Sequence, residues 1–187
     1  DMTGGSDPWY MKRVVDYILA NNAHLVVDAD RFYPVGGINP RPPLFSWSMA
    51  IGAMALEPFL NNPEDAVWWS MLGLPAVYGA LTVFPIASMA KDHFGKGAGV
   101  LAAWLIAFMP AHVTHSTWAL ADHDSFVMLF ISVGFMYWLR AVKYAGSARI
   151  SKTTSPHPLS FVRAFNDVAA HRQAALANAA LAGVAFG

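Results

Sequence analysis

The chain contains no cysteine and few charged residues. The absence of cysteine excludes a disulfide framework, a thiol nucleophile and a zinc–thiolate site. Charged residues make up 13% of the 187 residues and apolar residues 56%, whereas a soluble domain has roughly 25% charged residues. The formal net charge is zero and no basic run is present, so a nucleic-acid partner is disfavoured. These features indicate a protein that is largely surrounded by lipid.

Apolar segments of membrane-spanning length dominate the middle of the chain. We predict transmembrane helices at 67–90, 97–118 and 125–144, the first of which contains no charged residue. The apolar segment 44–60 lies at the lower limit of spanning length, so it either crosses the bilayer or lies in the interface. The pattern predicts an all-α, polytopic transmembrane fold.

Loops and shorter helices are expected at both ends of the chain. Residues 1–66 are predicted to form a loop region with helices, one beginning at Ser6-Asp7-Pro8 and ending near Asn21. Residues 145–173 are predicted to be a cytoplasmic loop, with a flexible part at 151–156 and a surface helix near its end. Residues 174–187 would start a further span. Because the chain starts with Asp and stops within this apolar run, we expect it to be part of a longer protein.

Positive charge predicts the orientation of the spans. Lys91 and Lys96 occupy one short loop, and six Lys or Arg residues lie between 140 and 172. Cytoplasmic loops carry an excess of such residues, so the segment around Asp122 is expected outside. The side on which Asp7 lies depends on whether 44–60 crosses the membrane, which the charge pattern leaves open.

Two carboxylates and an imidazole stand together at Asp122, His123 and Asp124, between two apolar segments. A charge in that position needs a partner, and two carboxylates suit a hard divalent ion such as Mg²⁺ or Mn²⁺. The alternative is a solvated turn whose Asp residues cap the next helix. His112 and His115 either join this site or lie near the interface. A transporter that binds an ion or relays protons through these groups is a further alternative.

Three motifs in order resemble a known family. They are Gly5-Ser6-Asp7-Pro8-Trp9-Tyr10, then Phe32-Tyr33-Pro34 with Pro42-Pro43-Leu44-Phe45, then Asp122-His123-Asp124. Together they resemble the N-terminal membrane part of the catalytic subunit of oligosaccharyltransferase, of the archaeal AglB type. The resemblance implies a GT-C glycosyltransferase fold with an interfacial amphipathic helix at 44–60, which places all the motif carboxylates on one side of the membrane.

The resemblance also implies an activity and its partners. Such enzymes transfer an oligosaccharide from a polyprenyl (dolichyl) phosphate or diphosphate carrier to Asn in Asn-x-Ser/Thr sequons of an acceptor protein. They act as multi-pass proteins, here expected in an archaeal cell membrane with the active site facing outside. Another GT-C enzyme that uses a polyprenyl-phosphate sugar, such as a protein O-mannosyltransferase, remains an alternative, as does an ion-coupled transporter.

Roles for individual residues follow from the same resemblance. Asp7 and Asp122 are implied to be catalytic, and Asp7, Asp122 and Asp124 to hold Mn²⁺ or Mg²⁺. The lipid phosphate or substrate is expected to contact His123, Arg41, Trp9 and Tyr10. The chain departs from archaeal members at Met11 and Asp124, where they commonly have His. A later-loop glutamate and a C-terminal soluble domain are absent, so we expect the 187 residues alone to be inactive.

Overall fold

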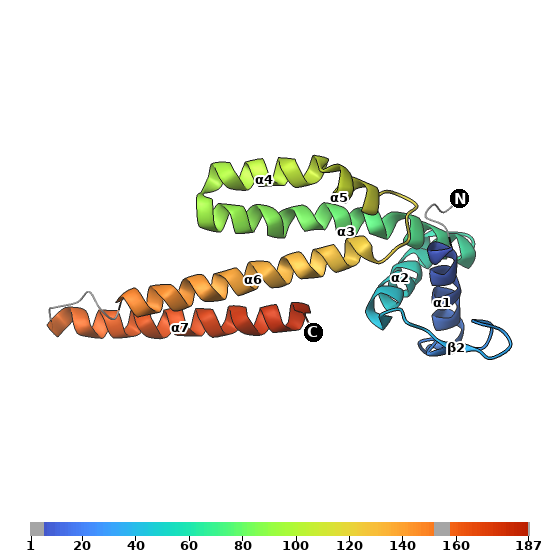
Figure 1. Ribbon diagram of the computed structural model, residues 1–187, viewed down its shortest axis with the longest axis horizontal. Coiled ribbons are helices and arrows are strands. Elements are labelled where there is room, and N and C mark those ends of the chain that lie inside the picture. Colours follow the sequence, from blue (N-terminus) through green and yellow to red (C-terminus); the bar gives the residue numbers. More distant parts are fainter. Residues whose placement is uncertain (1–5, 152–157, 187) are drawn as a thin grey trace. The chain divides into compact units, whose positions relative to one another are not determined.

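The structure, a computed structural model, describes residues 6–151 and 158–186, and these are mostly helical (Figure 1). The all-α fold class is therefore confirmed. The chain forms two compact units. Unit 1 runs to Ala80 and includes Pro110–Phe126, and unit 2 contains Leu81–Met109 and the residues from Val127 onward. The described parts of all the site motifs lie in unit 1.

The first helix of unit 1, α1 (Asp7–Asn21), confirms the prediction from Ser6-Asp7-Pro8. Ser6 is the N-cap residue and a proline occupies the first turn, where its missing N–H costs nothing. The helix ends where Asn22 turns left-handed and its N–H donates to Ile18 O at 2.8 Å. The buried face of α1 consists of Pro8, Met11, Val14, Val15 and Ile18.

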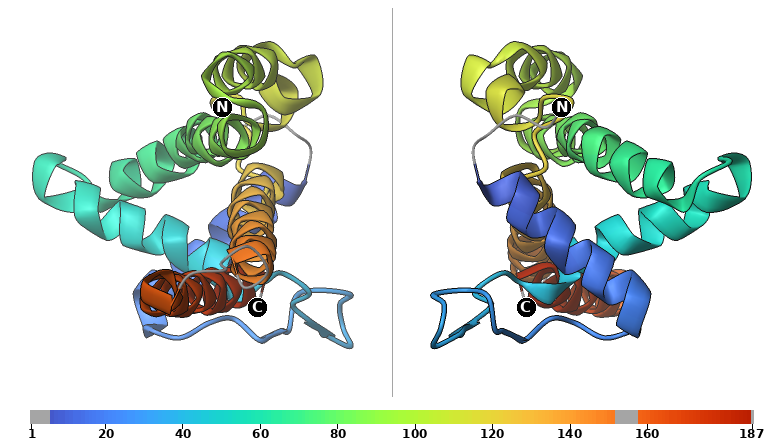
Figure 2. Two further views of the ribbon diagram at one scale, coloured as in Figure 1. Left: turned by 90° about the vertical axis from the view of Figure 1, so that its left-hand side faces the viewer. Right: turned by 90° about the vertical axis from the view of Figure 1, so that its right-hand side faces the viewer.

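A small hairpin interrupts the loop after α1 (Figure 2). Strands β1 (Val27–Asp28) and β2 (Gly37–Ile38) pair antiparallel, with Val27 opposite Ile38. Gly36, just before β2, has φ +77°, and a Cβ there would meet Asp28 O at 3.4 Å. These four residues form regular structure inside the region predicted as a loop with helices, and Gly36 allows the tight return between the strands.

Helix α2 (Pro43–Leu56) packs against α1 and is followed by a 3₁₀ turn, η1 (Glu57–Phe59). Its buried residues recur at helical spacing, so one face enters the core. Leu44 and Ile51 are exposed, so the remaining surface is also apolar. The α-helix is shorter than the predicted segment 44–60. The residues buried on α2 are Phe45, Ser46, Met49, Ala50 and Ala53.

Helix α3 (Pro63–Phe94) extends the predicted span 67–90 at both ends. Its first turn carries Glu64 and Asp65 and its last turn carries Lys91, as the helix dipole favours. In unit 1 its side chains complete a core shared with α1, α2 and Phe126, whose ring stands 5.5 Å from that of Phe45. This core supports the start of α1 and the segment before α6.

The prediction of one helix at 97–118 is wrong. The segment forms α4 (Lys96–Phe108) and the short α5 (Pro110–His115), separated by Met109 in an extended conformation. Proline has no N–H to donate and disfavours helical geometry at the residue before it, so Pro110 breaks the helix. At 13 residues, α4 alone is about 20 Å long, shorter than a hydrocarbon core of about 30 Å.

The prediction of a loop at 145–173 is also wrong for most of its length. Helix α6 (Asp124–Ser151) runs past the predicted end of 125–144, and α7 (Pro158–Phe186) begins before the predicted surface helix. The alanine-rich sequence of α7 has no proline after its first residue, so nothing ends the helix before 174–187. The segment 152–157 lies outside the described residues.

Unit 2 is held by contacts among its own helices. Arg140 Nε on α6 donates to Asp92 Oδ2 on α3 at 2.7 Å, and Tyr144 stacks on His171 of α7. Figures 1 and 2 show α6 and α7 side by side. Among the described residues, two helical stretches are long and apolar enough to cross a membrane by length and composition, Pro63–Phe94 and Asp124–Gly146.

Candidate metal and phosphate site

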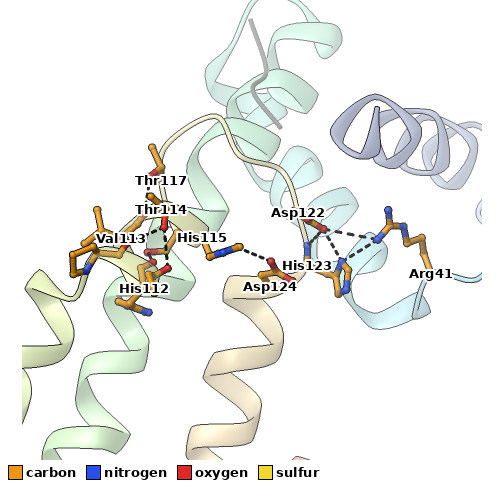
Figure 3. Close-up of polar contacts among 12 residues, drawn as sticks. Arg41, His112, Val113, Thr114, His115, Thr117, Asp122, His123 and Asp124 are labelled. Atoms are coloured by element: carbon orange, nitrogen blue, oxygen red, sulfur yellow. Dashed lines mark hydrogen bonds and ion pairs between the residues drawn. The ribbon is translucent and has the colours of Figure 1, made fainter. Parts of the chain in front are cut away.

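The predicted carboxylates meet through Arg41. Asp7 is the first residue of α1, Arg41 lies just before α2, and Asp122 and His123 lie between α5 and α6. Arg41 Nη2 contacts Asp7 Oδ1 at 2.6 Å, and Arg41 Nη1 lies 3.8 Å from Asp122 Oδ1. The guanidinium thus links two carboxylates from distant parts of the sequence. Figure 3 shows the Arg41 guanidinium pointing toward Asp122 and His123.

The segment that carries Asp122 is fixed by its backbone. Ala119 adopts φ +75° and its N–H donates to Leu72 O on α3 at 3.0 Å. The Asp122 N–H donates to Leu120 O at 2.8 Å, and Asp122 Oδ1 in turn accepts the His123 N–H at 2.7 Å. An alanine in the left-handed region is strained, and the hydrogen bond to α3 stabilises Ala119 in this conformation. The carboxylate of Asp122 is therefore positioned before any ligand binds.

The His123 ring stands between the carboxylate and the guanidinium. Its Nδ1 lies 2.6 Å from Asp122 Oδ1 and 3.0 Å from Arg41 Nη1. A protonated Nδ1 donates to the carboxylate, whereas an unprotonated Nδ1 accepts from Arg41, and one nitrogen does not do both. The shorter contact favours a proton on Nδ1, which leaves the Nε2 lone pair available to a proton donor or a metal.

Asp124, the first residue of α6, pairs with His115 at the end of α5. His115 Nδ1 lies 2.7 Å from Asp124 Oδ2 (Figure 3). His112 has a different role, because it is buried and its Nε2 donates to Gly79 O at 3.1 Å. Of the two histidines left open by the sequence, His115 therefore joins the site and His112 supports the packing of α5 on α3.

Within the part of the chain that the structure describes, one group could hold a metal ion, and it consists of Asp122, His123 and Asp124. Each offers one ligand atom, and these atoms lie within 4.8 Å of one another. Two carboxylates and one imidazole are a donor set that Mn²⁺ accepts, and the carboxylates also suit Mg²⁺. The residues therefore fit the predicted ion. Asp7 is not in this group, and the structure connects it to the group through Arg41.

A pocket of about 510 Å³ opens beside Asp7, Arg41 and His123. Tyr10 lines it, and the Tyr10 hydroxyl is buried without a hydrogen-bond partner in the described part of the chain. Trp9 does not line this pocket and instead packs edge-on against Trp68, 5.6 Å away. The other lining residues are Ser6, Arg13, Asp28, Asp30, Arg31, Pro40 and Pro42.

An ion-pair cluster on the pocket wall anchors the hairpin, and sequence reasoning missed it. Asp28 is 2% exposed and accepts from Arg13 Nε at 3.0 Å and Nη2 at 2.9 Å. Arg13 Nη2 also contacts Asp30 Oδ2 at 2.6 Å. The hydrogen bonds from Arg13 lower the pKa of the Asp28 carboxyl despite its burial. Arg13 and Asp28 are fifteen positions apart, with the rest of α1 and part of the loop between them, so no spacing rule indicates this pair.

The anchored hairpin leads directly to Arg41. Asn39 N donates to Val26 O at 2.8 Å, and the buried Asn39 side chain donates to Leu25 O at 2.9 Å. Asn39 Oδ1 then accepts the Arg41 N–H at 3.0 Å. The backbone of Arg41 is therefore held from the hairpin, while its side chain reaches the carboxylates.

Comparison with known proteins identifies the family. Residues 3–176 match the family described as "Oligosaccharyl transferase STT3, N-terminal". The chain belongs to the STT3 family. With its two apolar, span-length helices, it is part of a membrane protein. The motifs around Asp7 and Asp122 both lie within the matched range.

Three relatives show how much of such a protein this chain represents. It is 25% identical over 68% of its length to dolichyl-phosphooligosaccharide-protein glycotransferase 3 of Archaeoglobus fulgidus, and 27% identical over 73% to the STT3 subunit of dolichyl-diphosphooligosaccharide–protein glycosyltransferase of Saccharomyces cerevisiae. It is 30% identical over 64% to dolichyl-monophosphooligosaccharide–protein glycotransferase AglB of Haloferax volcanii. The matches span only 16%, 20% and 12% of these relatives.

Proposed function

We propose that this chain forms the metal- and phosphate-binding part of an enzyme that transfers an oligosaccharide from a polyprenyl (dolichyl) phosphate or diphosphate carrier to Asn in an Asn-x-Ser/Thr sequon. Membership of the STT3 family supports this proposal. The observation that carries it is the meeting of Asp7, Arg41 and Asp122 beside a pocket. The names of the relatives include both monophosphate and diphosphate carriers, so the number of phosphates stays open.

Asp122, His123 and Asp124 are the residues that would hold Mn²⁺ or Mg²⁺, with Asp7 nearby through Arg41. Such an ion neutralises negative charge that develops on the leaving phosphate. His115 contributes by fixing one side of the Asp124 carboxylate.

Arg41 and His123 are suited to the phosphate of the donor. The Arg41 guanidinium lines the pocket and offers paired N–H groups, which match phosphate oxygens in geometry. His123 lines the same pocket, and its Nε2 serves either the cation or a phosphate oxygen, not both at once. We assign Tyr10 to the wall that receives the substrate, whereas the place of Trp9 against Trp68 gives it a packing role.

Asp7 is suited to the acceptor amide. An amide nitrogen is a weak nucleophile because its lone pair is delocalised. An ionised carboxylate that accepts an N–H from the amide holds it in line for attack on the sugar. Asp7 is 53% exposed, so an acceptor chain can reach it from solvent. We place this site on the outer side of an archaeal cell membrane, as the positive charge near 91–96 and 140–172 indicates.

The test uses the full-length protein in detergent with a lipid-linked oligosaccharide and a fluorescent Asn-x-Thr peptide. We expect glycopeptide with Mn²⁺, none with EDTA, and a loss of at least about 100-fold in rate in Asp7→Asn and in Asp122→Asn. Asp16→Asn is the matched control, because Asp16 lies on α1 but pairs with Lys12 away from the site. Each variant is checked for its thermal unfolding midpoint.

Other outcomes separate the alternatives. Glycosylation of a Ser/Thr hydroxyl without any transfer to the Asn peptide would replace the proposal with an O-glycosyltransferase. Full activity with EDTA would contradict the role of the metal ion. Loss of activity in Asp16→Asn equal to that in Asp7→Asn would show that the carboxylates act through folding rather than at the site.

A further inference from the structure

We propose that Arg41 couples the divalent cation to the donor phosphate by exchanging partners: it pairs with Asp7 and Asp122 when no phosphate is bound and with the phosphate when the donor is bound. The inference rests on the proposed function. According to this proposal, the Arg41 side chain determines when the affinity for the divalent cation is high. The coupling is a property of this chain's Arg41 and is measured without following the glycan.

The contacts of Arg41 place one positive charge between the carboxylates. Its side chain is 15% exposed, and its two terminal nitrogens lie 2.6 Å from Asp7 Oδ1 and 3.8 Å from Asp122 Oδ1. Asp122 also belongs to the group that fits a divalent cation. A guanidinium beside the Asp122 carboxylate competes with the divalent cation for the negative charge of that carboxylate. The positive guanidinium also repels the cation directly. In this arrangement Arg41 weakens cation binding.

The His123 ring makes the arrangement responsive to a change at Arg41. Nδ1 lies 2.6 Å from Asp122 Oδ1 and 3.0 Å from Arg41 Nη1, so an Nδ1 proton donated to Asp122 faces a second N–H donor. If Arg41 turns away, this ring nitrogen loses its second neighbour and can keep a single partner. The same ring belongs to the cation-binding group, so a movement of Arg41 changes two of the three candidate ligands.

The pocket gives Arg41 an alternative partner. Arg41 and His123 both line the 510 Å³ pocket, and the backbone of Arg41 is held by Asn39, so only the side chain needs to move. A phosphate in the pocket pairs with the guanidinium through charge-assisted hydrogen bonds. When Arg41 pairs with the phosphate, its positive charge no longer lies beside Asp7 and Asp122. The cation then binds more tightly, and by reciprocity the cation strengthens phosphate binding.

The experiment measures Mn²⁺ affinity by EPR of free Mn²⁺ with the full-length protein in detergent. Titrations are run alone, with a polyprenyl monophosphate, with inorganic phosphate and with the uncharged polyprenol. In the unaltered protein we expect either phosphate to tighten Mn²⁺ binding, by on the order of tenfold, and the polyprenol to have no effect. A response to the polyprenyl phosphate alone would identify the lipid-borne phosphate as the partner, and a response to both would identify phosphate as such.

Arg41→Gln is the decisive variant. Without phosphate it should bind Mn²⁺ more tightly than the unaltered protein, by on the order of tenfold, because a competing charge is removed. Phosphate should then improve its affinity by a much smaller factor. Arg41→Lys keeps the charge and should retain weak binding in the absence of phosphate. Lys12→Gln removes a positive charge from α1 away from the site and should leave the affinity unchanged.

Two results would overturn the coupling: Arg41→Gln that binds Mn²⁺ no more tightly than the unaltered protein, or an undiminished phosphate effect in that variant. Transfer to the Asn-x-Thr peptide is followed in the same preparations. Normal transfer without the Mn²⁺ response would refute the coupling and leave the proposed function intact. The Mn²⁺ response without transfer would refute the function and leave the coupling intact.

Discussion

Gly79 allows Ser116, directly after α5, to approach α3 more closely than any larger residue would. A Cβ at Gly79 would stand 2.3 Å from Ser116 Cβ and 2.5 Å from its Oγ. We predict that Gly79→Ala lowers the stability of unit 1 by about 1–3 kcal/mol, as overpacking does. It should also weaken Mn²⁺ binding, because the displaced segment carries His115 toward Asp124. Tryptophan fluorescence during thermal unfolding, with Mn²⁺ titration, measures both effects.

Gly146→Ala is the control for this change. A Cβ at Gly146 meets nothing within 4 Å, and alanine favours a helix over glycine by up to about 1 kcal/mol. The substitution should therefore leave the unfolding midpoint unchanged or raised. An equal loss of stability in both variants would contradict the steric explanation.

The site residues differ in how clearly the sequence alone indicates them. The cluster Asp122-His123-Asp124 is evident from the chain alone, since charged residues between apolar segments need a partner. Asp7 and Arg41 were assigned through the family resemblance, because a carboxylate at a helix start and an arginine in a loop both have ordinary structural explanations. The ion pair that joins them depends on the path of the loop, which no spacing rule describes.

The hairpin is the element that holds Arg41, and its anchor is Asp28. The hydrogen bonds from Arg13 lower the pKa of the Asp28 carboxyl, so its folded pKa lies below the unfolded value. The ionised carboxylate therefore stabilises the fold at pH above the unfolded pKa of about 3.9. That stability is lost as pH falls through the lower, folded pKa.

We predict that Asp28→Asn destabilises unit 1 by about 2–4 kcal/mol near neutral pH, because a buried, paired carboxylate is replaced by an amide. The variant should also lose the part of the acid sensitivity due to Asp28. Thermal unfolding from pH 3 to pH 7 measures this. Asp30→Asn is the control, since Asp30 contacts the same arginine but is 69% exposed, and we expect it to have a small effect. A similar pH dependence in Asp28→Asn and the unaltered protein would contradict the assignment.

At the scale of elements, the predictions failed where a proline or a missing breaker decides the outcome. The apolar composition of 97–118 predicted one span, and the structure breaks at Pro110 into α4 and α5. The segment 145–173 was predicted as a loop. Its polar composition indicates exposure to water, but polar residues do not end a helix. The helices α1 and α3 were predicted well because caps, charges and apolar length agree in them.

For the whole molecule, the ion pairs of Arg41 impose a condition on the path of the chain through the membrane. Asp7 and Asp122 both contact Arg41, so both lie on the same side. Between them the chain leaves unit 1 within α3 and returns at Pro110. If α3 crosses the bilayer, the segment of α4 and α5 has to cross back. Neither helix is long enough alone, with 13 and six residues, but together they reach about the 20 residues that a span needs.

This condition predicts a specific labelling pattern. The 187 residues contain no cysteine, so a cysteine introduced among them reports on its own position once any elsewhere in the protein are replaced. A membrane-impermeant maleimide should label Asp30→Cys and Thr117→Cys in intact cells, and Lys96→Cys only after permeabilisation. Labelling of positions 30 and 117 on opposite sides would contradict the Arg41 ion pairs as well as the return through α4 and α5. Labelling of position 96 from outside would instead show that α3 does not cross, which the lysines at 91 and 96 argue against.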